Sequence, residues 1–498
     1  MSMKRLVLFL ALVALALSTQ KAGAAERLPN IVLLLADDLG YGDLGAFGQR
    51  KIRTPNLDRL AADGARLTRH YSGNAVCAPS RCVLMTGKHP GHAFIRDNRE
   101  LKPEGQQPIG VGETTLAELL HRAGYATGAF GKWGLGGPGS EGEPLKKGFD
   151  RFFGYNCQRL AHSYYPTSLW DNATRVALNN PPFAAHQKLP VGADTNSPAT
   201  FAGFIGKDYA PDRITAEAVR FIEANVARPF FLYYPTTVPH LALQVPEDSL
   251  AEYSGKFAEA AYLGDRSYLP HRTPRAAYAA MVTRMDRDIG RLLETLKKHG
   301  LEKDTIVVFS SDNGPLFDQL GGTDTDFFNS AAGFRGRKGS LYDGGVRVPT
   351  IIRWPGRVTA GRTVDALGGF EDWLPTLLEL AALKSLVPDG IDGRSLAPAL
   401  LGGNVPEKEF LYREFPAYGG QQAIWSGRWK AIRQKLTPAS KKGGSPLTEL
   451  YDLASDPKES RNVAAENPAV VARLEALMKS QHTPSTVFPF PALDASSR

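Results

Sequence analysis

The segment Asn30-Ile-Val-Leu-Leu-Leu-Ala36 is a continuous apolar run, and Asp37-Asp38-Leu39-Gly40 follows it directly. The segment Thr305-Ile-Val-Val-Phe-Ser310 repeats this arrangement, because Ser311-Asp312-Asn313-Gly314 comes next. Strands that are apolar on both sides are typical of a parallel sheet that helices cover on both faces. The two segments therefore predict buried strands of an α/β sheet, each ending in acidic or amide side chains.

Helical patterns lie between these segments and two further candidate strands, Ala126–Phe130 and Pro229–Tyr234. The stretch Thr283–Lys298 carries apolar residues at helical spacing on one face, and 115–123 and 212–226 show the same pattern. Strand and helix thus alternate along most of the chain up to about residue 380. This order predicts an α/β fold with a large, mostly parallel sheet flanked by helices.

The character of the sequence changes near Pro388-Asp-Gly-Ile-Asp-Gly393, where turn-forming residues gather. Short strand-like stretches follow, and an apolar helical pattern runs from Val470 to Gln481. We predict a main α/β domain over 25–403 and a smaller domain over 404–498, built from an antiparallel sheet and a helix. The Gly- and Pro-rich segment 134–211 is expected to be an irregular functional insertion.

The N-terminal residues indicate the compartment. Lys4 and Arg5 precede an apolar run from Leu6 to Leu17, and Ala22-Gly-Ala24 offers a cleavage site. This is typical of a signal peptide covering residues 1–24, so we expect a periplasmic or secreted protein. The run is shorter than the roughly 20 residues that span a membrane, although an uncleaved anchor is the alternative.

Composition restricts the class of protein and of partner. The chain has 498 residues with 59 Lys and Arg against 51 Asp and Glu, and 43% of its residues are hydrophobic. These values exclude disordered, collagen-like and coiled-coil proteins. Basic residues form no dense block, so a nucleic acid is not expected as a partner, and no membrane span is expected after the leader.

Asp37, Asp38, Asp312 and Asn313 follow the two strands in matching positions. Ligands of an open α/β sheet bind outside the carboxyl ends of its strands. Three carboxylates gathered there require a cation, and oxygen ligands suit Ca²⁺ or Mg²⁺ better than zinc. The alternative is that each residue caps a helix or turns a loop. The matching positions favour the metal site.

Cys77 begins the stretch Cys77-Ala-Pro-Ser-Arg81, just before an expected helix. The unpaired N–H groups and the dipole of a helix N-terminus stabilise negative charge, which would favour a functional cysteine. The alternative is a buried structural cysteine. The chain has three cysteines, so a disulfide framework is excluded and one cysteine must stay unpaired.

The stretch Cys77-Ala-Pro-Ser-Arg81 resembles the signature of the type I sulfatases, in which this cysteine is oxidised to formylglycine. The resemblance covers nearly the whole mature chain, and its motifs occur in the same order as in that family. The family lies within the alkaline phosphatase superfamily. Besides the two strand ends, it rests on these motifs: Gly124-Tyr-Ala-Thr127, Gly131-Lys-Trp133, Pro239-His240, Lys338-Gly-Ser-Leu-Tyr-Asp-Gly-Gly345 and Glu449-Leu-Tyr-Asp452.

The resemblance implies a role for each matched residue. One Ca²⁺ ion would be held by the strand-end residues together with the modified Cys77. Arg81 would hold the formylglycine hydrate through its fork of donors. Lys132 and Lys338 would bind the sulfate oxygens, and His240 would lie near the bridging oxygen. A formylglycine-generating enzyme or an anaerobic maturase is the implied partner.

The resemblance also implies a mechanism. One hydroxyl of the hydrated aldehyde attacks sulfur, the alcohol leaves, and a sulfate hemiester forms on the enzyme. The second hydroxyl then loses its proton and expels sulfate, which restores the aldehyde. His240 or Lys338 is expected to protonate the leaving alcohol, with His240 preferred because imidazole titrates nearer neutral pH.

The sequence departs from the family at Gly134. Many sulfatases have histidine at this position, where it contacts the formylglycine. Asp312 or a histidine from elsewhere would therefore have to act as the base. We select His162 as a candidate residue of the active site, while a surface-loop histidine is the alternative.

The segment 154–170 resembles that of sulfatases acting on sulfated sugars, some of them galactose or N-acetylgalactosamine sulfates. Aromatic faces stack on sugar rings, so its aromatic residues are candidate walls of a sugar site, or else core residues of the loop. The candidate walls are Tyr155, Tyr164, Tyr165 and Trp170, with Arg159, Arg413 and Trp425 as additions.

The leading hypothesis is a secreted or periplasmic, Ca²⁺-dependent sulfatase that hydrolyses sulfate monoesters of carbohydrates. One alternative keeps the scaffold but hydrolyses phosphate or phosphonate esters. The other is a non-catalytic sulfoglycan-binding protein in which Cys77 is never converted.

Overall fold

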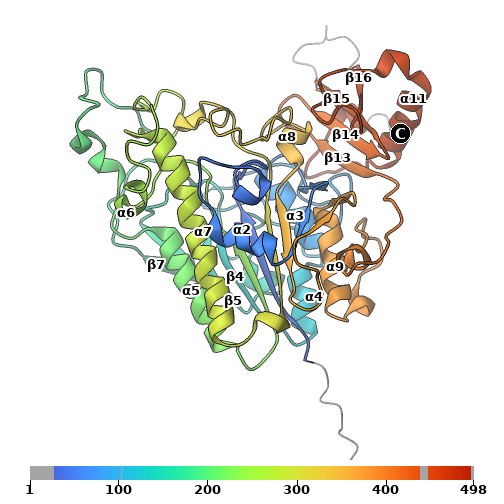
Figure 1. Cartoon of the computed structure of the whole chain (residues 1–498), viewed down its shortest axis with the longest axis horizontal. Coiled ribbons are helices and arrows are strands. Elements are labelled where there is room, and N and C mark those ends of the chain that lie inside the picture. Colours follow the sequence, from blue (N-terminus) through green and yellow to red (C-terminus); the bar gives the residue numbers. More distant parts are fainter. Residues whose placement is uncertain (1–26, 103, 438–446, 495–498) are drawn as a thin grey trace, which may run out of the picture.

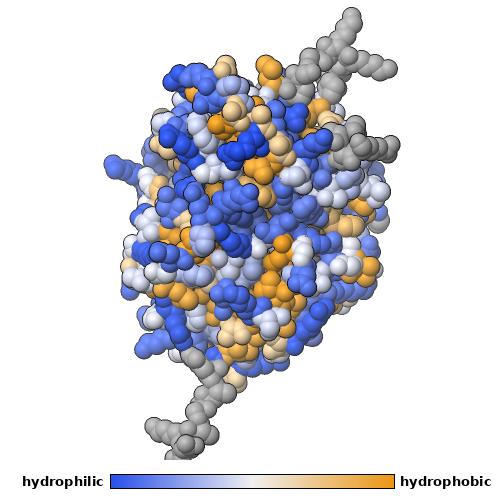
Figure 2. Space-filling view, turned by 90° about the vertical axis from the view of Figure 1, so that its right-hand side faces the viewer, coloured by the Kyte–Doolittle hydropathy of each residue, from blue (hydrophilic) through white to orange (hydrophobic). Residues whose placement is uncertain are grey.

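The computed structural model describes residues 27–102, 104–437 and 447–494. The predicted signal peptide, 1–24, lies outside the described residues. No helix in the described ranges is long and apolar enough to cross a bilayer. On the face seen in Figure 2, hydrophilic residues are interspersed with smaller hydrophobic patches.

A ten-stranded sheet forms the centre of the molecule (Figure 1). Its inner strands are parallel, and antiparallel strands extend both sides, which confirms the predicted mixed, mostly parallel sheet. In spatial order the strands are β11 (Arg362–Val364), β2 (Ala65–Leu67), β10 (Thr350–Arg353), β9 (Thr305–Ser311), β1 (Asn30–Ala36), β8 (Phe230–Pro235), β4 (Ala126–Lys132), β5 (Arg151–Tyr155), β6 (Ser168–Asp171) and β7 (Thr174–Ala177).

The register of β1 and β9 fixes where their polar ends lie. Ala36 pairs with Ser311, the last residue of β9, so both strands end at the same level of the sheet. The backbone N–H of Asp312 continues this pairing by donating to the carbonyl of Ala36 at 3.0 Å. The next residues of the two strands are therefore neighbours, as their matching positions in the sequence predict.

Helices cover the two faces of the sheet because successive residues of β1 point to opposite sides. Val32 and Leu34 pack in the core that includes the buried faces of α2 (Pro55–Ala62), α5 (Ala210–Ala224) and α7 (Pro274–Lys298). Ile31 and Leu33 pack in the core on the other face, under α3 (Cys77–Thr86), α4 (Leu116–Arg122) and α9 (Trp373–Leu380). In Figure 1 these two groups of helices lie on either side of the strands.

Two elements differ from the sequence predictions. Helix α7 begins at Pro274 rather than near Thr283, because its first turns bury mainly alanines, which give a weaker apolar pattern than large side chains. The segment predicted to be irregular, 134–211, contains β5, β6 and β7; a long loop joins β5 to β6, and a two-residue turn joins β6 to β7. These strands escape detection because each is only four or five residues long.

A second sheet lies at the C-terminal end of the chain and confirms the predicted small antiparallel sheet. It consists of β13 (Leu411–Phe415), β14 (Gln421–Ser426), β15 (Trp429–Gln434) and β16 (Thr448–Asp452). One face, including Ile424, packs on helix α11 (Pro468–Ser480). The other face packs on loops of the main sheet. The boundary at 403/404 between two domains stays a prediction.

A buried polar network joins the small sheet to the rest of the molecule. The Asp343 carboxylate accepts hydrogen bonds from Lys430 Nζ at 2.9 Å, Trp425 Nε1 at 3.2 Å and the Tyr71 hydroxyl at 3.0 Å. Lys430 Nζ also pairs with Glu459 Oε1 at 2.5 Å. The side chains of Lys430, Asp343 and Glu459 are all fully buried. The lysine therefore compensates two carboxylates that lie out of reach of water.

We predict that Lys430→Met strongly destabilises the protein, because it removes the cation that pairs with the buried Glu459 and leaves the more distant Arg347 Nη1, at 3.4 Å, to compensate Asp343. Chemical unfolding should show a loss of about 3–5 kcal/mol, the range found when one partner of a buried pair is removed. The exposed Lys479 on α11 provides the control, since Lys479→Met should stay within about 0.5 kcal/mol of the wild type. Equal stability of the two variants would contradict the role of the network.

Candidate active site

The polar ends of β1 and β9 form the floor of the site. The backbone N–H of Asp38 donates to Asp312 Oδ1 at 3.2 Å, and Asn313 Nδ2 donates to Asp38 Oδ1 at 2.7 Å. Asp38 has a φ of 65°, and aspartate is one of the few residues with a side chain that tolerates this conformation. Asp37, Asp38, Asp312 and Asn313 are all fully buried. The structure thus brings together the residues that the sequence selects.

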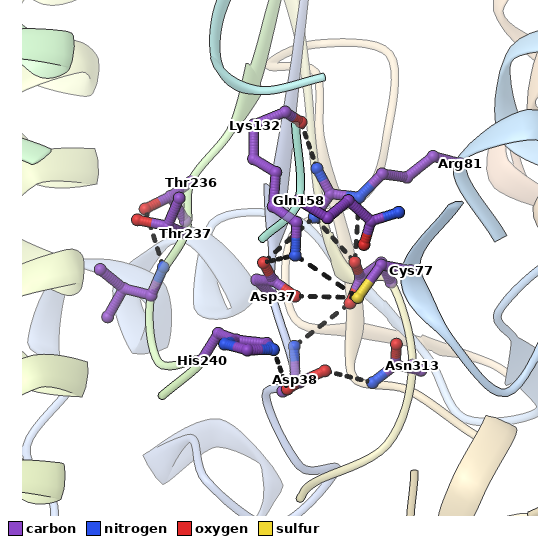
Figure 3. A network of polar contacts seen from close by, with 12 residues as sticks. Asp37, Asp38, Cys77, Arg81, Lys132, Gln158, Thr236, Thr237, His240 and Asn313 are labelled. Atoms are coloured by element: carbon purple, nitrogen blue, oxygen red, sulfur yellow. Dashed lines mark hydrogen bonds and ion pairs between the residues drawn. The ribbon is translucent and has the colours of Figure 1, made fainter. Parts of the chain in front are cut away.

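Cys77 lies above this floor as the first residue of α3. Its Sγ is 3.4 Å from Asp37 Oδ1, 3.5 Å from Lys132 Nζ and 3.6 Å from Lys338 Nζ, as Figure 3 shows in part. Burial and the neighbouring Asp37 raise the pKa of the thiol far above its usual range. An unmodified Cys77 is therefore a neutral thiol, which is a poor nucleophile and a poor ligand.

Arg81 lies one turn after Cys77 on the same helix and points to the same floor. Its Nε and Nη2 donate to Asp312 Oδ2 at 3.0 and 2.7 Å, and its Nη1 donates to the carbonyl of Lys132. Asp312 and Asp37 outweigh the effect of burial, so the pKa of Arg81 is raised and its charge is permanent. The rigid fork thus ties α3 to the ends of β9 and β4.

Two lysines supply further positive charges of the cluster. Lys132, the last residue of β4, places Nζ 2.5 Å from Asp37 Oδ2. Lys338 places Nζ 2.8 Å from the Asp38 carboxylate. With Arg81, the two lysines supply three positive charges against the three carboxylates of the floor, so the cluster has no net charge of its own.

The cluster fits a hard divalent cation. Asp37, Asp38, Cys77 and Asp312 each place one ligand atom within 4.8 Å of the others. Among the described residues, the Asn313 Oδ1 atom is buried without a hydrogen-bond partner, so it can serve as a ligand. Burial and Asp37 raise the pKa of Asp312 to about 6, and positive charge nearby would favour its ionised form. Such a set of oxygen donors suits Ca²⁺ or Mg²⁺.

A second group of potential metal ligands, His89, His92 and Asp392, has its ring nitrogens largely occupied. His89 Nδ1 accepts from the backbone N–H of Gly91, so its Nε2 carries the proton and donates to Gln481 Oε1 at 3.2 Å. His92 Nδ1 bonds to Asp392 at 2.9 Å. These contacts indicate a structural link to the end of α11 rather than a metal site.

His240 and His162 stack at the side of the cluster, with ring centroids 4.9 Å apart. His240 Nδ1 donates to the carbonyl of Leu241 at 2.7 Å, so the neutral ring has its lone pair on Nε2, 3.4 Å from Asp38. Burial and Lys338 lower the pKa of His240. By contrast, Asp38 outweighs burial and raises the pKa of Lys338. At neutral pH Lys338 carries a proton to donate, and His240 does not.

Gly134, where the resemblance implies a histidine, has no side chain, and Gln158 occupies the adjoining space. A Cβ atom on residue 134 would lie 3.3 Å from the Gln158 side chain, and the φ of Gly134 is +80°. Gln158 Nε2 donates to Asn98 Oδ1 at 3.1 Å, and this oxygen also accepts from the N–H of Ala78 at 3.0 Å. In Figure 3 the Gln158 amide lies beside Arg81 and above Cys77.

A cavity of about 420 Å³ opens over the cluster. The predicted residues Cys77, His162, His240 and Lys338 line it, whereas Arg81 and Lys132 are fully buried behind it. Sequence reasoning missed several other residues that line the cavity. Their only signal in the sequence is that they follow a strand or lie in a long loop. They include Asn98, Gln158, His186, Tyr268, Phe317 and Tyr418.

Some predicted walls of a sugar site are core residues instead. Tyr155, Tyr164 and Tyr165 are buried, and the Trp170 indole donates to Glu104 outside the cavity. The prediction was wrong for Arg413 and Trp425. Arg413 is fully buried against Glu371, with Nη2 to Oε2 at 2.8 Å, and Trp425 belongs to the buried network around Asp343. Arg159 does line the cavity.

Comparisons of the sequence with known proteins agree with this geometry. The family model described as Sulfatase matches residues 29–383, and the model described as N-sulphoglucosamine sulphohydrolase, C-terminal, matches 335–483. Arylsulfatase A of Homo sapiens is 34% identical over 93% of this chain and 90% of the relative. N-acetylgalactosamine-6-O-sulfatase of Bacteroides thetaiotaomicron is 31% identical over 93% of this chain and 94% of the relative.

Comparison of structures points the same way. The crystal structure of Ps i-CgsB in complex with k-i-k-neocarrahexaose matches with a TM-score of 0.71 and 27% sequence identity. The match covers 91% of this chain and 92% of that chain.

We predict that Ca²⁺ raises the melting temperature, because a cation bound only by the folded state stabilises it. The melting temperature should be higher in excess Ca²⁺ than in EGTA. The variants Asp38→Asn and Asn313→Ala should largely remove this difference. His92→Asn, in the second group of potential ligands, is the control and should keep it. If Asn313→Ala keeps the full difference in melting temperature and His92→Asn loses it, the Ca²⁺ site does not lie at the ends of β1 and β9.

Proposed function

The chain belongs to the sulfatase family and is a sulfuric ester hydrolase, and we propose that it desulfates carbohydrates with a formylglycine formed from Cys77 and a bound Ca²⁺ ion. One observation carries the proposal. A carboxylate of the cation site and two lysines converge within 3.6 Å of the single atom Cys77 Sγ. Nucleophile, cation and anion-binding groups would thus meet at one point.

Conversion of Cys77 would give a role to the charged groups around residue 77, which a neutral thiol does not use. The thiol is buried, and its raised pKa keeps it protonated, so it gains little from its position at the start of α3. Because Cys77 is only 1% exposed, a maturation enzyme would have to reach it before the chain folds. A formylglycine-generating enzyme or an anaerobic maturase is the partner that this chemistry requires.

Once formed, the hydrated aldehyde would supply the attacking hydroxyl, and Ca²⁺ would help to neutralise the sulfate oxygens. Lys132 and Lys338 are fixed by Asp37 and Asp38 on two sides of residue 77. They would hold the transferring group without rearrangement, which is the main source of electrostatic catalysis. Arg81 would hold residue 77 and Asp312 in register through its three donated hydrogen bonds.

Proton transfer follows from the states of the surrounding groups. Lys338 is protonated and lines the cavity, so we assign it as the acid that protonates the leaving alcohol, in place of the preferred His240. Asp312, the carboxyl that the sequence offers as a base, has an oxygen within 4.8 Å of Cys77 Sγ. It is therefore our choice for the base. Gln158 is an amide and would only orient a hydroxyl.

The class of substrate is inferred from relatives and from the cavity. Relatives include an enzyme named for N-acetylgalactosamine 6-sulfate, and a similar structure holds a neocarrahexaose. The cavity combines hydrogen-bonding side chains with aromatic ones, as sugar sites do. A sulfated galactose or N-acetylgalactosamine residue is our proposed substrate. The predicted leader supports a location in the periplasm or outside the cell.

We predict that mass spectrometry of the mature protein finds an aldehyde in place of the thiol at Cys77. Cys82, a second buried free cysteine on the same helix, is the internal control and should keep its thiol. Active protein with an unmodified Cys77 would contradict the proposed mechanism. An unconverted Cys77 in inactive protein that still binds sulfated sugar would support the non-catalytic alternative.

We predict that Lys338→Met slows the release of sugar alcohols by about 10²–10⁴-fold, the usual contribution of a general acid. An activated aryl sulfate needs little help from an acid, so its kcat should fall less, by the part that Lys338 contributes to holding the sulfate. His240→Asn should not show this dependence on the leaving group. Equal losses for both substrates in Lys338→Met would contradict the assignment of the acid.

A further inference from the structure

Two exposed aromatic side chains, Phe317 and Tyr418, lie at the mouth of the cavity that also contains Cys77 and Lys338. They are 44% and 65% exposed, and their ring centroids are 6.4 Å apart. Phe317 comes from the loop after β9, and Tyr418 comes from the turn between β13 and β14. Neither takes part in the chemistry described above. We call this pair the rim platform.

The rim platform is held in place by its surroundings. The Tyr418 ring packs on Phe415 at 5.5 Å between centroids and lies over Gly339. A Cβ atom on residue 339 would be 2.9 Å from Tyr418 and 3.5 Å from Phe317. Gly339 directly follows Lys338, so the absence of a side chain there lets both rings approach the lysine that would bind sulfate. The platform thus packs against the backbone directly after Lys338.

Exposure increases from the cluster toward the platform. The side chain of Lys132 is 0% exposed and that of Lys338 is 12% exposed, whereas Tyr418 is mostly exposed. A sulfate group held between the two lysines would therefore occupy the closed end of the cavity. The ring that carries the sulfate would fill the middle, and whatever is bonded to that ring would reach the rim.

Polar side chains also line the cavity. Arg159 and Glu100 form an exposed ion pair at 3.2 Å, and Asn98 and Gln106 belong to the same lining. A sugar ring has a face of C–H groups and an edge of hydroxyls, so it fits a space lined by both aromatic and hydrogen-bonding side chains. This complementarity selects a carbohydrate as the occupant of the platform.

We propose that Phe317 and Tyr418 bind the sugar ring next to the sulfated one, so that the enzyme acts on oligosaccharides in preference to monosaccharides. This inference rests on the proposed function and deepens it. The platform offers apolar area that a monosaccharide sulfate leaves in water. An oligosaccharide covers this area and gains binding energy that the shorter substrate lacks.

The test compares kcat/KM for two substrates, N-acetylgalactosamine 6-sulfate and a tetrasaccharide with this residue at its non-reducing end. A matched pair carrying galactose 6-sulfate is run in parallel. The wild type should prefer the tetrasaccharide. Phe317→Ala and Tyr418→Ala should each lower kcat/KM for the tetrasaccharide about tenfold, equivalent to about 1.4 kcal/mol, and lower it for the monosaccharide far less.

Two controls separate stacking from structural damage. Tyr418→Phe keeps the ring and should keep the preference for the tetrasaccharide. Leu401→Ala removes another exposed apolar side chain, 48% exposed and outside the cavity, and should change neither value. Equal losses on both substrates in the alanine variants would show a structural role and overturn the inference.

Two other outcomes would also overturn it. One is a wild type with no preference for the tetrasaccharide. The other is a dimer in size-exclusion chromatography that Tyr418→Ala converts to a monomer without a change in preference, because the platform would then be covered by a second copy of the chain. Mature wild type that releases sulfate from none of these sugars would instead contradict the proposed function, and this inference with it.

Discussion

Three buried carboxylates, Asp37, Asp38 and Asp312, are balanced by Arg81, Lys132 and Lys338, and the rest of the site depends on this balance. Burying six charges costs several kcal/mol for each ion, and good geometry recovers only part of that cost. An apolar core of the same volume would be at least as stable. The cluster is therefore better explained by the ligands that it binds than by a contribution to the stability of the fold. Because its net charge is zero, a bound divalent cation would make the site positive and so favour the entry of an anionic ester.

The sheet supplies the precision that such a cluster needs. The pairing of Ala36 with Ser311 makes β1 and β9 end together, and Lys132 ends β4 on the other side of β8. Helix α3 adds Cys77 and Arg81 from one rigid element, since the two residues lie one turn apart. Most groups of the site thus lie at the end of a strand or on a helix. Lys338 and His240 come from loops. Rigid elements hold reacting groups more accurately than loops do.

Much of this arrangement could be predicted from the sequence, and the limits have a physical cause. Apolar runs that end in Asp37 or Asp312 indicate strands and strand ends, because that pattern is local. Whether a side chain lines a cavity depends on partners far along the chain, which no local pattern reveals. Arg413 was named as a candidate wall from the C-terminal domain, yet Glu371 neutralises it in the interior. Gln158 and the rim platform were missed for the same reason.

One cation and a converted residue 77 would share the site at the ends of β1 and β9. The decisive measurement is a crystal structure of the mature, calcium-loaded enzyme with sulfate, including the anomalous signal of calcium. We expect a calcium peak bound by Asp37, Asp38, Asp312, Asn313 and an oxygen of residue 77, with sulfate between Lys132 and Lys338. A thiol at residue 77, or a calcium peak at His89, His92 and Asp392 instead, would contradict this arrangement.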